Sequence, residues 1–105
     1  MSVLLDVMQE EEDRLKELSK FYVKEIAAKP KGSLSIKTIG KHRYAYVNYR
    51  EGDKIKTLYI GSEHDKDVAA MVKAIEERRR YERWLREVKQ NLKLLHRVLH
   101  ASRKG

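Results

Sequence analysis

Apolar side chains recur at intervals of three, four and seven residues near the start of this sequence. They form one stripe that consists of Leu4, Met8, Leu15, Leu18, Tyr22 and Ile26. This spacing matches the helical period of about 3.6 residues. Pro30 cannot continue a helix, and Gly32 allows a turn. We therefore predict an amphipathic helix over about residues 3–28.

A second helical pattern extends from Ser62 to about Ala101 without a glycine or proline. Ser62 precedes acidic residues, which is typical of a helix N-cap. From residue 81 onward the apolar spacing alternates between four and three and gives a heptad stripe: Tyr81, Leu85, Val88, Leu92, Leu95 and Leu99. Heptad stripes pack against another helix. We expect this helix to pack antiparallel to the first, and its remaining heptads to form a partner or dimer interface.

Between these helices, apolar and polar residues alternate, which is the pattern of β-strands. We expect three strands, over residues 33–39, 42–49 and 54–60. Gly52 can adopt the positive φ that a two-residue hairpin loop needs, so we place the second loop at Glu51-Gly52. The middle of the chain is therefore predicted to be a three-stranded antiparallel meander.

The position of this loop decides which side chains of the hairpin share a face, because a one-residue slip moves every side chain to the other side. One face is expected to carry Tyr44, Tyr46, Asn48, Ile55, Thr57 and Tyr59. The opposite face is expected to carry Arg43, Ala45, Val47, Tyr49, Lys54, Lys56, Leu58 and Ile60. We expect the tyrosine-rich face to pack and the lysine-bearing face to contact a partner.

These elements predict an α+β fold in one domain, residues 1–105. Its parts are a long N-terminal helix (about 3–28), the meander (about 33–61), a very long C-terminal helix (about 62–101) and a basic tail (102–105). The two helices are expected to form an antiparallel hairpin or coiled coil with the small sheet at one end. A length of 105 residues is typical of a single domain.

Positive charge is unevenly distributed along the chain, which has a formal net charge of +8. Residues 1–29 hold five basic and seven acidic side chains, whereas residues 30–105 hold nineteen basic and nine acidic ones. The ribbon and the second helix therefore carry the positive field. Such a field attracts phosphate backbones or acidic protein surfaces.

The densest group of cations is "ERRRYERWLR", residues 77–86. Its candidate phosphate contacts are Arg78, Arg79, Arg83 and Arg86. Arginine suits bidentate contact with phosphate, and a nearby tryptophan such as Trp84 can stack on an exposed base. The same segment also fits a solvated helix face with i,i+4 pairs such as Glu82–Arg86, and Trp84 fits a packing role.

Catalytic and metal-binding patterns are missing from the sequence. It has no cysteine, which excludes disulfides and thiolate metal sites and fits a cytoplasmic location. His96 and His100 are four residues apart but have no third ligand nearby. No glycine-rich phosphate loop and no positioned nucleophile with its base is present. We therefore expect no enzyme activity, no metal, no cofactor and no small-molecule substrate.

A membrane location is not expected either. No stretch approaches the roughly 18 apolar residues that span a bilayer. The N-terminal segment becomes acidic at once, which is unlike a signal peptide.

The segment "YAYVNYREGDKIKTLYIG", residues 44–61, resembles a ribbon of small uncharacterised prokaryotic and phage proteins and of the N-terminus of some insertion-sequence transposases. In outline, residues 31–80 are also similar to the arm-type DNA-binding domain of phage-type integrases, where a three-stranded sheet followed by a helix reads DNA. This resemblance implies that the sheet contacts DNA through Lys37, Arg43, Lys54 and Lys56.

These observations predict a small basic accessory protein of a mobile element or phage that binds DNA or RNA. Its β-ribbon and its arginine-rich helix face would contact phosphates. One alternative is a protein–protein interaction module that grips a nucleic-acid-bound protein, such as a phage inhibitor of a host defence complex comparable to anti-CRISPR proteins. Another is a coiled-coil adaptor that forms a homodimer without a nucleic-acid role.

Overall fold

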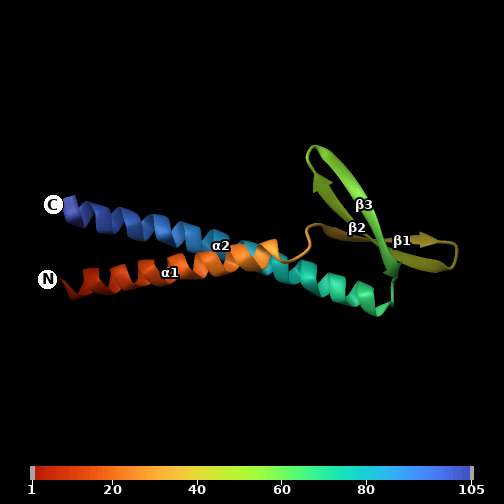
Figure 1. Cartoon of the computed structure of the whole chain (residues 1–105), viewed down its shortest axis with the longest axis horizontal. Coiled ribbons are helices and arrows are strands. Elements are labelled where there is room, and N and C mark those ends of the chain that lie inside the picture. The colour runs from red at the N-terminus through yellow and green to blue at the C-terminus, as the bar shows by residue number, and fades with distance from the viewer. Residues whose placement is uncertain (1, 105) are drawn as a thin grey trace. The chain divides into compact units, whose positions relative to one another are not determined.

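The chain consists of two helices and a three-stranded sheet, which confirms the predicted α+β fold. The computed structural model describes residues 2–104, and the side chains of residues 2–101. The elements follow in the order α1 (Val3–Ala27), β1 (Ser33–Ile39), β2 (His42–Glu51), β3 (Lys54–Ser62) and α2 (Lys66–Lys104) (Figure 1). Residues 102–104, predicted to be a tail, thus belong to α2, and residue 105 lies outside the described part.

These elements form two compact units. The first, the hairpin unit, contains α1 and the part of α2 from Arg80 onward. The second, the sheet unit, comprises residues 28–79 and so contains the three strands and the beginning of α2.

In the hairpin unit, α1 and the end of α2 run antiparallel (Figure 1). Leu15 of α1 and Val88 and Leu99 of α2 are buried. Tyr22 lies against Tyr81, with 5.6 Å between the ring centroids. The other residues of the heptad stripe, namely Leu85, Leu92 and Leu95, are half-buried. Much of the apolar surface predicted to face a partner therefore packs against α1 of the same chain.

In the sheet unit the strands are ordered β1-β2-β3 and are all antiparallel, as the meander predicts. The pairing of Glu51 with Lys54 places the second loop at Gly52-Asp53, one residue later than expected. Gly52 has a φ of 65° at the first loop position, which is the pattern of a type II′ turn. Our placement was wrong because it put this glycine second in the loop.

The corrected loop moves the partners by two residues, so that Tyr46 faces Tyr59 and Val47 faces Leu58. Because side chains alternate with a period of two, this shift leaves each side chain on its expected face. A bulge interrupts the pairing between Ala45 and Tyr46. Ala45 pairs with Gly61 beyond the bulge, which leaves Ile60 as the extra residue.

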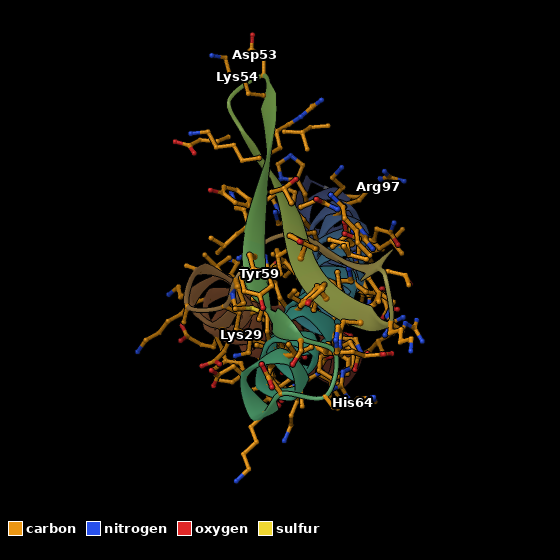
Figure 2. All side chains as sticks on the ribbon, turned by 90° about the vertical axis from the view of Figure 1, so that its right-hand side faces the viewer. Lys29, Asp53, Lys54, Tyr59, His64 and Arg97 are labelled. Carbon is orange, nitrogen blue, oxygen red and sulfur yellow. The ribbon has the colours of Figure 1, made fainter. Side chains whose placement is uncertain are left out.

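The core of the sheet unit lies on the face opposite to the one expected to pack. Ala45 and Val47 are buried, with exposures of 0% and 4%, although they lie on the lysine-bearing face. Val68 and Ile75 of α2 are buried as well, and complete the core of the sheet unit. The lysines of the same face lie near the loop: Figure 2 shows Lys54 at the tip of the β2–β3 hairpin. The prediction that the tyrosine-rich face packs was therefore wrong.

Helix α2 begins at Lys66, four residues after the predicted N-cap Ser62. Ser62 belongs to β3 because it pairs with Tyr44 beyond the bulge. A turn follows, in which the Ser62 amide donates to Asp65 Oδ2 at 3.0 Å. The Asp65 carbonyl then accepts from the amides of Val68 and Ala69 at 3.1 and 3.2 Å. Asp65, and not Ser62, therefore stands at the helix N-terminus.

Candidate functional site

The face of the sheet that α2 leaves open carries three neighbouring tyrosine rings, and we call it the tyrosine face. Tyr46 and Tyr59 are direct cross-strand partners, and their ring centroids are 5.5 Å apart. Tyr44 lies two residues further along β2, 6.2 Å from Tyr59. Tyr59 is 54% exposed, and the other two rings are half-buried. Strand alternation and one cross-strand pair therefore build a continuous aromatic surface.

A lysine lies beside these rings. Lys37 of β1 pairs with Tyr44 across the sheet, and its side chain is exposed. Its Nζ lies 4.7 Å from the centroid of the Tyr46 ring, within the range of a cation–π interaction. The tyrosine face thus holds an ammonium group directly over an aromatic ring.

Next to the tyrosines, a polar ladder crosses the three strands. The Asn48 amide group donates to Ser35 Oγ at 3.1 Å, and the Thr57 hydroxyl donates to Asn48 Oδ1 at 2.8 Å. Beyond the ladder, Arg50 pairs with Ile55, and both are exposed. The tyrosine face therefore has a cation on each side, Lys37 and Arg50. Arg50 was not among the predicted contacts, although strand alternation places it with Tyr44 and Tyr46.

The other cations predicted from the integrase-like resemblance do not gather at one place. Arg43 forms an ion pair with Glu63 at 3.2 Å, and Lys56 forms one with Glu51 at 3.0 Å. Lys54 is exposed and pairs with Glu51 in the ladder, eight residues from Arg43 along β2. Eight residues of a strand span about 26 Å. Of the four predicted contacts in the sheet, Lys37 alone lies on the tyrosine face.

Two of the predicted arginines of α2 contact the backbone before β1. Arg78 donates from Nη1 to the carbonyl of Lys29 at 2.7 Å. Arg79 donates from Nη2 to the carbonyl of Gly32 at 3.4 Å. These contacts hold the linker between α1 and β1 against α2 within the sheet unit. The guanidinium of Arg78, which is half-buried, therefore has a structural partner.

Residues 80–86 of the arginine-rich segment belong to the hairpin unit. Arg83 and Arg86 are exposed there. Trp84 contacts Tyr22 and Tyr81, with ring centroids 5.9 and 5.5 Å apart. This agrees with the packing interpretation of Trp84.

An apolar groove lies along the hairpin unit. Its lining residues are Met8, Glu11, Leu15, Asn91, Leu94, Leu95 and Val98. Leu94 is 55% and Val98 is 45% exposed. Leu94 and Val98 lie outside the heptad stripe. Because residues four apart share a helix face, their spacing could have predicted this second apolar strip.

One acidic side chain is buried in the same unit. Glu12 is 7% exposed and accepts a hydrogen bond from Lys16 Nζ at 3.2 Å. This bond, aided by Gln9 and by the charge of His96, lowers the pKa of Glu12 below 4.5 despite the opposing effect of burial.

In residues 2–104, no three His, Asp or Glu side chains group in a way that could hold a metal ion. Neither helix, as far as it is described, combines the length and apolar character needed to cross a membrane.

A family model for a domain of unknown function, DUF6788, matches residues 5–70. The chain belongs to this family. The DUF6788 segment contains most of α1, the whole sheet and the first residues of α2, so the tyrosine face lies inside it. The arginine-rich segment and the heptad stripe lie beyond it. No curated protein and no solved structure matches the chain.

Proposed function

We propose that this DUF6788 protein binds nucleic acid through its sheet, with cations at the tyrosine face in contact with phosphates. The supporting observation is that Lys37 and Arg50 flank an open sheet face, and neither forms an ion pair among the described residues. Lys41, in the turn between β1 and β2, is exposed and equally without an ion pair in that part of the chain.

Net charge supports the same proposal. Residues 28–79 carry twelve lysines and arginines against seven acidic residues. Cations that contact phosphates release condensed counterions, so the affinity falls as salt rises. Three phosphate contacts correspond to a log–log slope of about −2 to −3. This proposal keeps Lys37 and replaces Arg43 and Lys56, which are already paired, by Lys41 and Arg50.

A pair of charge-reversal variants tests the proposal. The Lys37→Glu/Arg50→Glu variant changes the tyrosine face, whereas Lys66→Glu/Lys73→Glu makes the same change in net charge at exposed positions of α2. Binding to a fluorescein-labelled oligonucleotide is measured by anisotropy over a salt series. We expect the first variant to weaken binding at low salt by about tenfold or more, since each lost ionic contact is worth on the order of 1 kcal/mol. We expect the second to weaken it far less.

Two results would count against the proposal. If the wild-type protein does not bind DNA or RNA at low salt, the function is wrong. If both double variants weaken binding equally, net charge alone accounts for it and the sheet face is not the site.

A second candidate function, self-association, is favoured by the groove of the hairpin unit. Residues 6–13 of α1 include five acidic side chains, whereas residues 89–97 of α2 include cations and no acid. In a twofold-symmetric pair, the acidic segment of each copy can face the basic segment of the other while Leu94 and Val98 become covered. A second copy of the chain is therefore the occupant that suits this groove.

Sedimentation velocity tests this candidate. The wild-type protein should sediment as a dimer of the 12.4 kDa chain, and Leu94→Glu should sediment as a monomer. Gln90→Glu, at an exposed position of the same helix outside the groove, should remain dimeric. A monomeric wild-type protein at the highest soluble concentration would exclude dimerisation.

A further inference from the structure

We infer that the tyrosine face selects single-stranded nucleic acid by stacking unpaired bases on Tyr44, Tyr46 and Tyr59. This inference rests on the proposed function and specifies its ligand. Tyr59 is 54% exposed and lies beside the half-buried rings of Tyr44 and Tyr46, and an aromatic cluster that reaches the surface in this way is typical of a binding site. The rings present π-faces and edges side by side, with centroids 5.5 and 6.2 Å apart.

Bases can reach these rings only in a single strand. In a duplex the flat faces of the bases are stacked on one another, so a protein surface meets phosphates and base edges. In a single strand the bases can spread out and stack on aromatic side chains, which is a large and sequence-tolerant contribution to binding. A broad sheet face with rings at its centre therefore favours the single strand.

The cation next to the rings suits the same ligand. Lys37 Nζ lies over the Tyr46 ring, 4.7 Å from its centroid, so a base that stacks on Tyr46 displaces this ammonium group, which can then contact the phosphate of the same nucleotide. Arg50, on the other side of the polar ladder, is placed to contact a phosphate further along the strand. A group of rings with a cation on each side suits a single strand, whose bases can stack on the rings while its phosphates contact the cations.

The polar groups of the face are partly used in hydrogen bonds to one another. Asn48 forms hydrogen bonds to both neighbours, from its amide nitrogen to Ser35 Oγ at 3.1 Å and from Thr57 Oγ1 to its amide oxygen at 2.8 Å. Hydrogen-bond readout of a specific base needs available donors and acceptors. Stacking, and not sequence readout, is therefore the main source of selectivity expected here.

The sheet also provides an internal control. Tyr49 lies on the same strand as Tyr46, but its side chain is on the opposite face, where it pairs with Lys56. It is half-buried, like Tyr46. Replacement of Tyr49 removes the same chemical group from the same strand without changing the tyrosine face.

Three labelled probes of equal length separate stacking from charge: a single strand of mixed sequence, its duplex, and a strand of abasic sites that has phosphates but no bases. By fluorescence anisotropy at one salt concentration, the wild-type protein should bind the single strand about tenfold or more tightly than the other two. Tyr46→Leu/Tyr59→Leu should lose about 30-fold or more of the affinity for the single strand, from two lost stacking contacts. Its affinity for the duplex and the abasic strand should be nearly unchanged.

Two further variants complete the test. Tyr49→Leu should bind all three probes like the wild-type protein. Tyr46→Phe/Tyr59→Phe keeps the rings and should retain single-strand binding, so it tests stacking even if the leucine variant fails to fold. Circular dichroism verifies folding of each variant.

The outcomes distinguish this inference from the proposed function. Equal wild-type binding to all three probes overturns base stacking and leaves phosphate binding intact. Absence of wild-type binding to every probe overturns both. If Tyr49→Leu weakens single-strand binding as much as Tyr46→Leu/Tyr59→Leu does, the tyrosine face is not the site of stacking.

Discussion

Gly32 lies immediately before β1, where the chain passes close to β2. Its φ is 127°, a conformation that residues with a Cβ rarely adopt. A Cβ built at this position would lie 2.6 Å from the carbonyl oxygen of Asn48 and 2.7 Å from Cγ1 of Val47. The first of these atoms is backbone, and the second belongs to a buried side chain, so neither can move away easily.

The expected cost of Gly32→Ala has two parts. The positive φ costs a residue with a Cβ about 1–2 kcal/mol. Forcing an extra methyl group into a packed site costs about 1–3 kcal/mol. We therefore expect the substitution to lower the free energy of unfolding of the sheet unit by about 2–5 kcal/mol.

Two other glycines supply matched controls. Gly40 and Gly52 have φ values of 62° and 65°, but a Cβ at either position would meet no atom within 4 Å. Gly40→Ala and Gly52→Ala should therefore cost about 1–2 kcal/mol, from the backbone conformation alone.

Urea denaturation measures the difference. Four of the six tyrosines lie in the sheet unit and the single tryptophan lies in the hairpin unit. Near-UV circular dichroism of tyrosine therefore reports mainly on the sheet unit, with a contribution from Tyr22 and Tyr81, and fluorescence of Trp84 reports on the hairpin unit. The midpoint of the tyrosine signal should fall by about 1 M or more in Gly32→Ala. If it falls no further than in the two control variants, the close approach of Gly32 to β2 is not a stabilising constraint.

Two further predictions concern single polar contacts. Arg78→Ala should lower the free energy of unfolding by about 1–3 kcal/mol, because the Lys29 carbonyl loses a charged donor. Arg79 makes a long, exposed bond to the Gly32 carbonyl, so Arg79→Ala should lower the free energy of unfolding by less than about 0.5 kcal/mol in the same urea assay. The pKa of Glu12 is lowered below 4.5 in the folded protein, chiefly by Lys16, so its contribution to stability is present above that pH and is lost as the pH falls below it. Glu12→Gln should therefore lose stability less steeply than the wild-type protein below pH 4.5, and equal slopes in urea melts would contradict this.

The elements of this protein were largely predictable because their patterns are local. The spacing of Leu15, Leu18 and Tyr22 indicates α1 without reference to any other part of the chain. Strand alternation assigned Tyr46 and Val47 to opposite faces, and this assignment survived a two-residue change of register, since a shift by two preserves the face.

The start of α2 was less predictable, because Ser62 suits two structural roles, a helix N-cap and a strand residue. Its sequence context suits an N-cap, but its backbone pairs with Tyr44 across the bulge. This pairing extends β3 to Ser62, so that Asp65 lies at the N-terminus of α2 instead. The residues around Ser62 do not indicate that it will pair with Tyr44, because Tyr44 is distant in the sequence.

The two helices, the three strands and the two sets of side chains on the sheet follow from local sequence patterns. Which set is covered, and which cations are already paired, follows from tertiary contacts. Val68 and Ile75 of α2 share a core with Ala45 and Val47, on the face opposite to the exposed Tyr59. Glu63 forms an ion pair with Arg43, and Glu51 forms one with Lys56. The difference arises from distance along the sequence. Backbone periodicity is encoded by neighbouring residues, whereas burial and ion pairing depend on residues that come together only when the chain folds.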